Sequence, residues 1–226
     1  MKLLALEAGG AVLGAALFED GRPVASAQQS ALQRQAETLA PLVQRLLAAQ
    51  GWSASDLNVV ACGLGPGSFT GLRSSLAFGR GLQLGVPGMT LAGVPTLHAW
   101  AEAFAPQKDH EISVLLDGRR GQAYRARLRR QGGSWVEALP SALIDLRDAL
   151  AEAGDDAGAA LLSDMEPMRL APLVAVPVQL ESPALALAVG RLGLRALEAG
   201  KLPHWEPLYL RRSEAEILWD KLHPKP

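Results

Sequence analysis

The sequence is poor in cysteine, in excess charge and in long apolar runs. A single cysteine, Cys62, among 226 residues excludes an intrachain disulfide, and its apolar surroundings predict a small buried thiol. The formal net charge is −1, whereas a stand-alone nucleic-acid-binding protein usually carries a clear basic excess. No apolar run approaches the roughly 20 residues of a transmembrane helix, and Glu7 interrupts the N-terminal run too early for a signal peptide. We therefore expect a cytoplasmic protein without membrane contact.

Residues that commonly bind metal or act as catalysts are also scarce. The four histidines have none of the spacings of metal-ligand motifs: His98, His110, His204 and His223. No Ser/His/Asp or Cys/His constellation can be read from the sequence, although such triads form in space rather than along the chain. We expect no metal and no cofactor bound by this chain alone.

The most distinctive segment present is residues 63–85, GLGPGSFTGLRSSLAFGRGLQLG. The apolar run 57–62 before it predicts a strand, and Ser68 or Thr70 is placed to cap a following helix. A strand, a glycine loop and a helix N-terminus in this order can bind phosphate through backbone N–H groups, but the lysine of a P-loop is missing. The candidate cofactor-binding residues are Glu7, Gly65, Gly67 and Ser68. The alternative, which we favour, is that this loop is a purely structural turn.

The sequence also contains an internal repeat. Three strands are predicted in the first part of the chain, at 2–6, 11–18 and 23–27. Their counterparts about 110 residues later are strands at 112–116, at 122–130 and a third that contains Trp135 and Val136. Each first strand ends at an acid, Glu7 or Asp117. Further strands are predicted at 89–92, 159–162 and 173–176, and helices at about 35–50, 68–85, 96–104, 143–153 and 182–200. The repeat predicts a mixed α/β chain of two related lobes.

Four segments together resemble the TsaB (YeaZ) family of tRNA threonylcarbamoyladenosine synthesis: LLALEAGG (3–10), GPGSFTGLR (65–73), LLDGRRGQAY (115–124) and EPLYLR (206–211). The resemblance implies the duplicated actin-like (ASKHA, RNase H-like) two-lobe fold, with mixed sheets and flanking helices. We expect an N-terminal lobe at 1–104 and a C-terminal lobe at 105–226, with residues from about 205 packing back on the first lobe.

The resemblance further implies a non-catalytic scaffold and activator of a TsaD-like catalytic subunit. With a TsaE-like ATPase, such a complex transfers a threonylcarbamoyl group to the adenosine next to the anticodon of tRNA. ATP and metal are then expected on the partner subunits, tRNA only within the complex, and a homodimer when the chain is alone. The alternatives are an autonomous ATPase or kinase of the same fold and, less favoured, a peptidase. Glu7, where the family usually has aspartate, and the absence of a TsaD-type histidine pair disfavour both.

The partner surface implied by the resemblance is built from the helices at about 35–50 and 68–85. The residues predicted to form it are Leu39, Leu42, Val43, Leu46, Leu72, Arg73, Leu76, Gly79 and Arg80, and we expect a charge at Leu76 to abolish both associations. Arg125, Arg127 and Arg129 alternate along one strand and so share a face. They are candidates for contact with tRNA phosphate, with ion pairing on a solvated sheet face as the favoured alternative. Glu206, Tyr209 and Arg211 are interpreted as docking the C-terminal segment onto the lobes.

Overall fold

The computed structural model describes residues 1–10, 12–30, 35–104, 111–154, 160–165, 177–179, 184–211 and 214–223. Its first sheet has the strand order β3-β2-β1-β4-β5, in which β1 pairs antiparallel with β2 and parallel with β4. These strands are β1 (Lys2–Glu7), β2 (Val12–Glu19), β3 (Arg22–Ser30), β4 (Val59–Gly63) and β5 (Thr90–Val94). None of the helices in the described ranges is long and apolar enough to cross a bilayer.

The second sheet repeats this arrangement, because the order β8-β7-β6-β9-β10 matches that of the first sheet strand for strand. Here too the first three strands are antiparallel and the other two parallel. The strands are β6 (Glu111–Arg119), β7 (Gln122–Gln131), β8 (Ser134–Asp145), β9 (Ala160–Ser163) and β10 (Pro177–Gln179). The predicted duplication and the two-lobe actin-like α/β fold are thereby confirmed.

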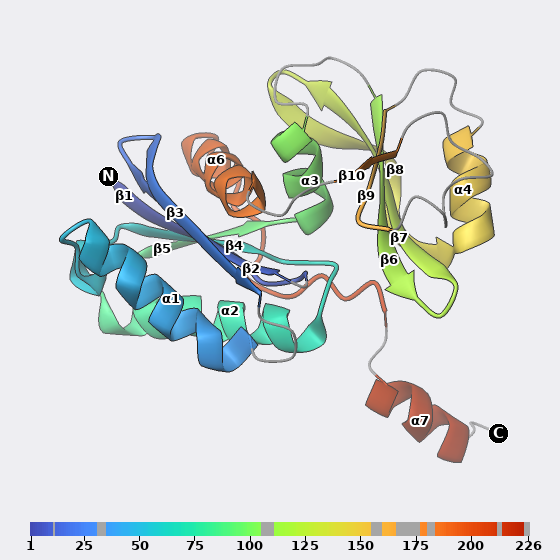
Figure 1. Ribbon diagram of the computed structural model, residues 1–226, viewed down its shortest axis with the longest axis horizontal. Coiled ribbons are helices and arrows are strands. Elements are labelled where there is room, and N and C mark those ends of the chain that lie inside the picture. Colours follow the sequence, from blue (N-terminus) through green and yellow to red (C-terminus); the bar gives the residue numbers. More distant parts are fainter. Residues whose placement is uncertain are drawn as a thin grey trace.

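Helices cover both faces of the first sheet (Figure 1). On one face, α1 (Gln35–Ala49) and α2 (Phe69–Gly85) pack with Leu4, Leu6 and Val60 in one hydrophobic cluster. On the other face, α6 (Ala184–Glu198) packs with Leu3 and Ala5 in a second cluster. Helix α3 (Thr96–Phe104) lies between α6 and the second sheet, to which this cluster extends. Because successive side chains of a strand point to opposite faces, the apolar run of β1 serves both clusters.

Several boundaries differ from the sequence predictions. Residues 143–145 belong to β8, because Leu143 and Ile144 pair with β7, and α4 (Leu146–Gly154) begins only after them. Strand β4 begins at Val59 rather than at residue 57. A helix that we did not predict, α7 (Glu214–Leu222), lies apart from both sheets in Figure 1. The strand predicted at 173–176 lies outside the described residues.

Helix α6 belongs to the C-terminal half of the chain but packs on strands β1, β2, β4 and β5 of the first sheet. Its glycines permit this close approach: a Cβ added at Gly190 would lie 2.1 Å from the ring of Phe18, and one at Gly193 2.7 Å from Ala61. The division at residue 104 therefore describes the two sheets but not the helices around them, and as a domain boundary it stays a prediction.

Candidate functional site

The glycine loop before α2 packs backbone to backbone against the loop between β1 and β2. The N–H of Ser68 donates to the carbonyl oxygen of Gly9 at 2.7 Å. A Cβ added at Gly67 would lie 2.6 Å from that same oxygen, so the residue must be glycine for the loops to meet. Ser68 caps α2, as predicted, by accepting a hydrogen bond from the N–H of Gly71 at 3.3 Å. Two N–H groups near this helix end are therefore already bonded within the chain.

Glu7 ends β1 in a closed environment and is only 2% exposed. Its Oε1 accepts from the N–H of Gly9 at 2.7 Å, and its Oε2 accepts from the hydroxyl of Thr96 at 3.1 Å. Burial raises the pKa of the Glu7 carboxyl group, and the hydrogen bonds from Gly9 and Thr96 partly offset that rise. A Cβ at Gly63 would lie 2.0 Å from Oε2, so position 63 must be glycine for the Glu7 carboxylate to occupy this place.

The candidate cofactor-binding residues lie around the same two loops, and the hydrogen bonds of Glu7, Gly65 and Ser68 go to residues of these loops, to the first turn of α2 and to Thr96 at the start of α3. Gly65 has a φ of +98°, which favours glycine, and its N–H donates to the same Thr96 hydroxyl at 3.1 Å. These contacts are compatible with a structural turn, and cofactor binding at these residues stays a prediction. Within the described part of the chain, no group of three or more His, Cys, Asp or Glu side chains could hold a metal ion.

A segment that we call the strap, residues 205–211, runs along α2 and reaches the second sheet. The indole N–H of Trp205 donates to the carbonyl of Leu76 at 3.1 Å, and the N–H of Leu208 donates to the carbonyl of Leu64 at 2.7 Å. At its far end, Arg211 donates to the side chain of Gln122 on β7 at 2.6 Å. The strap therefore packs back on the first lobe and connects it to the second.

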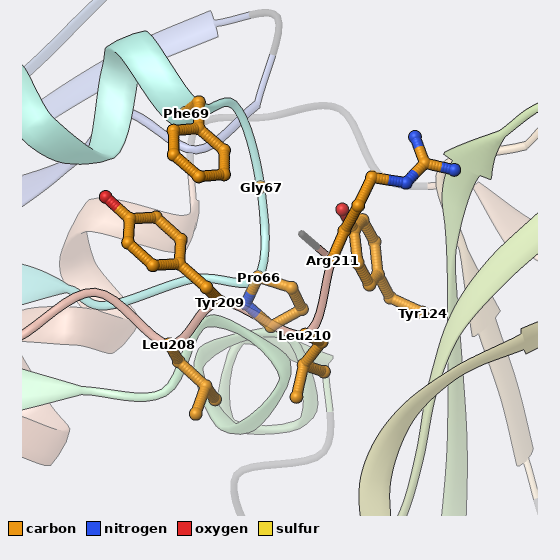
Figure 2. A pocket seen from close by; sticks show the side chains of 8 residues that line it. All are labelled: Pro66, Gly67, Phe69, Tyr124, Leu208, Tyr209, Leu210 and Arg211. Atoms are coloured by element: carbon orange, nitrogen blue, oxygen red, sulfur yellow. The ribbon is translucent and has the colours of Figure 1, made fainter. Parts of the chain in front are cut away.

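Figure 2 shows the hollow that the strap leaves between the two lobes. Phe69 and Tyr209 are stacked on one side of it, while Arg211 and Tyr124 lie together on the side of the second sheet. Its empty volume is about 180 Å³, which includes space that is open to solvent. The docking role predicted for Tyr209 and Arg211 is thus supported by their contacts, whereas Glu206 is exposed.

The structure corrects the predicted partner surface. Its apolar members lie in the protomer's own hydrophobic core or beside it and are at most 7% exposed: Leu39, Leu42, Val43, Leu46, Leu72 and Leu76. Gly79 is also buried, because the ring of Trp205 covers it. The apolar residues that the sequence analysis assigns to the partner surface instead pack α1 and α2 on their own sheet. Of the predicted residues, only Arg73 and Arg80 are exposed.

Apart from Arg73 and Arg80, the outer face of α1 and α2 consists of residues outside the predicted set. On α2 the exposed positions follow helical spacing, at Thr70, Arg73, Ala77, Arg80, Gly81, Leu84 and Gly85. On α1 they are mostly small or polar: Ala36, Glu37, Ala40, Pro41, Gln44, Arg45 and Ala48. Leu84 is 81% exposed. Reasoning from the sequence did not include this leucine in the partner surface. A face of small side chains with one large exposed leucine can receive another helix at close distance.

The three arginines of β7 differ in their surroundings. Arg125 is 13% exposed, and its Nε lies 2.8 Å from a carboxylate oxygen of Glu152 on α4. Arg127 donates to the backbone carbonyl of Glu152 at 2.8 Å. Arg129 is exposed, with its guanidinium 4.0 Å from the carboxylate of Glu111. Arg125 and Arg129 therefore have acidic partners, as the ion-pairing alternative expects, and Arg127 is bonded to the backbone of α4. Contact with tRNA stays a prediction.

Comparison with known proteins identifies the family. A family model described as tRNA N6-adenosine threonylcarbamoyltransferase (TsaD) matches residues 28–172. The chain is 34% identical over 138 residues to the Escherichia coli tRNA threonylcarbamoyladenosine biosynthesis protein TsaB, covering 60% of this chain and 58% of that protein. It is 35% identical over 192 residues to an uncharacterized protein of Mycobacterium tuberculosis, covering 81% and 78%.

The solved structure of YeaZ from Pseudomonas aeruginosa superposes with a TM-score of 0.75 at 24% identity, covering 92% of this chain and 99% of that one. This agreement shows the same two-lobe fold over nearly the whole chain. The alignment to the E. coli relative spans less than two thirds of that protein. The family model and the relatives show that the chain belongs to the TsaB (YeaZ) family of tRNA threonylcarbamoyladenosine biosynthesis proteins.

Proposed function

We propose that this chain is a non-catalytic scaffold subunit that binds and activates a TsaD-like catalytic subunit. The complex transfers a threonylcarbamoyl group to the adenosine next to the anticodon of tRNA. A TsaE-like ATPase completes the complex, ATP and metal bind to the partner subunits, and tRNA binds only to the assembly. The chain acts in the cytoplasm and forms a homodimer when its partner is absent.

The observation that carries this proposal is the closed glycine loop. An actin-like enzyme needs backbone N–H groups and a carboxylate open to nucleotide and metal. Here the Ser68 N–H is bonded to Gly9, and Glu7 is enclosed by Gly9, Gly63 and Thr96. A chain whose phosphate loop is filled by its own atoms is better suited to support a catalyst than to be one.

The partner surface in this proposal is the outer face of α1 and α2, centred on Leu84 and Ala77. Small residues such as Ala40, Ala48 and Gly81 allow two helix pairs to approach closely, and Leu84 provides an apolar anchor. The same face serves the homodimer, so TsaD-like partner and second copy compete for it.

The rival function is an autonomous ATPase or kinase of the same fold. It would require Mg-ATP to bind between the lobes, where the strap now crosses. Tight binding of Mg-ATP by the isolated chain, measured by calorimetry, would favour this rival.

A reconstitution experiment tests the proposal. The TsaD-like and TsaE-like subunits of the same organism should modify tRNA with ATP, threonine-derived substrate and this chain present, and lose most activity when it is omitted. Leu84→Asp should abolish association with the TsaD-like subunit and the homodimer, because it buries a charge in the interface. Leu202→Asp, at a leucine that is also exposed but lies outside α1 and α2, is the matched control. Unchanged association of the Leu84→Asp chain in ultracentrifugation would refute this surface.

A further inference from the structure

Arg73 lies on the exposed face of α2, yet its guanidinium group is held in one orientation. Its Nε donates a hydrogen bond to the hydroxyl oxygen of Tyr209 at 2.8 Å. Its central carbon lies 4.8 Å from the ring centre of Phe69 and 5.7 Å from that of Tyr209. The two rings are stacked, with centres 4.2 Å apart and planes inclined by 2°. The arginine therefore rests at the edge of a rigid aromatic pair, one ring from α2 and the other from the strap.

This fixation leaves the functional end of the arginine available. Within the described ranges, Nε provides the only hydrogen bond of Arg73, so its two terminal nitrogens have no acceptor there. Those nitrogens form a planar fork that matches the two oxygens of a carboxylate. A side chain that is already ordered loses less conformational entropy on binding, so fixation by Tyr209 increases affinity.

We propose that Arg73 forms a bidentate pair with an Asp or Glu side chain of the TsaD-like partner, and that Tyr209 is its positioning residue. This proposal rests on the proposed function and adds the strap to the binding surface. The first turn of α2 strengthens the attraction, because a helix N-terminus carries partial positive charge.

The surroundings of Arg73 favour a protein carboxylate over a tRNA phosphate. Its exposed neighbours on α2 are Thr70 and Ala77, with Leu84 farther along the same face. Nucleic-acid surfaces instead gather several basic side chains, and their affinity comes from the summed charge. Arg80, two turns further along, differs because one of its terminal nitrogens already donates to Gln83 at 2.6 Å. Arg80 is therefore the matched control for an exposed but self-paired arginine.

A double-mutant cycle tests the pair of residues, with affinity for the TsaD-like subunit measured by calorimetry in the absence of tRNA. Arg73→Ala should weaken binding about tenfold, the loss typical of a charge-assisted hydrogen-bonded pair. Tyr209→Phe keeps the stacked ring and removes the hydroxyl acceptor, and should weaken binding about threefold. The double variant should be no weaker than Arg73→Ala alone, because Tyr209 acts only through Arg73.

Additional variants separate the alternatives. Arg73→Lys keeps the charge but loses the fork, so its affinity should match that of Arg73→Ala; wild-type affinity would overturn the bidentate pair. Additive losses in the cycle would overturn the positioning role of Tyr209. An Arg73→Ala effect that is seen only with tRNA present would overturn the carboxylate assignment. The Arg80→Ala chain should bind the TsaD-like subunit at least as tightly as the Tyr209→Phe chain. The melting temperature of each variant shows whether it is folded. If the wild-type chain does not bind the TsaD-like subunit, the proposed function itself fails, whereas wild-type binding with an unaffected Arg73→Ala refutes this inference alone.

Discussion

At the scale of single residues, two glycines of α2 show how neighbouring positions of one helix differ in purpose. A Cβ added at Gly79 would lie 2.6 Å from the ring of Trp205 and 3.3 Å from the side chain of Val60. A Cβ added at Gly81 would meet nothing within 4 Å. Gly79 is therefore required by the packing of the strap on α2, whereas no contact within the described chain accounts for Gly81.

Substituting alanine at each position should change stability in opposite directions. Gly81→Ala should raise the free energy of unfolding by up to about 1 kcal/mol, because alanine is the better helix former. Gly79→Ala should lower it by about 1–3 kcal/mol, because the extra methyl group overpacks against Trp205. Urea denaturation followed by circular dichroism measures both values. A change of the same sign in the two variants would contradict the role given to Trp205.

At the scale of elements, the helices and strands of the first half were largely predictable, but their outward faces were not. The sequence predicted α3 with both its ends and α2 with a cap at Ser68 or Thr70, of which Ser68 is the cap, because cap residues, glycine and apolar spacing are local signals. It assigned Leu72 and Leu76 to a partner, although both are buried in the protomer. Apolar periodicity shows that a helix has a buried side, but not which protein buries it. Because Leu76 is 5% exposed, a charge there should destabilise the protein itself, so a loss of association in that variant would not report on the partner surface.

The strap and α7 follow one another along the chain but should differ in their effect on stability. A chain ending at Arg211 lacks α7, whose Leu218, Trp219 and Leu222 are exposed. Its free energy of unfolding should lie within about 1 kcal/mol of that of the full chain. A chain ending at His204 also loses Trp205 and Leu208, which pack on the first lobe, and should be destabilised by about 3 kcal/mol or more. Thermal and urea denaturation compare the three lengths. Equal stability of all three would show that the strap is not needed for the fold.

At the scale of the whole molecule, one buried carboxylate joins three elements that are distant in the sequence. Glu102 on α3 is 1% exposed, accepts a hydrogen bond from the indole N–H of Trp135 on β8 at 2.9 Å, and pairs with Arg195 on α6 at 2.5 Å. Helix α6 packs on the first sheet, α3 packs on α6 and on strands β6, β7 and β8, and Trp135 belongs to the second sheet. Glu102 therefore contributes to holding the two lobes together.

Removing this carboxylate should weaken the contact between the lobes. Glu102→Ala leaves the buried indole N–H of Trp135 without an acceptor and should lower the free energy of unfolding by about 1–3 kcal/mol. Glu198→Ala, at an exposed glutamate of α6, should change it by less than about 0.5 kcal/mol. Urea unfolding followed in parallel by circular dichroism and tryptophan fluorescence measures both. Equal stability of the two variants would mean that water replaces the carboxylate at no cost.

The sequence by itself determined the duplicated α/β architecture and the family, because strand repeats and the segment GPGSFTGLR are local patterns that do not depend on distant contacts. Only the tertiary structure decided that Glu7 and Ser68 bond within closed loops, since hydrogen-bond partners such as Thr96 and Gly9 come from other parts of the chain. It also decided that Tyr209 meets Arg73, 136 residues earlier, because that contact forms only when the strap folds back along α2.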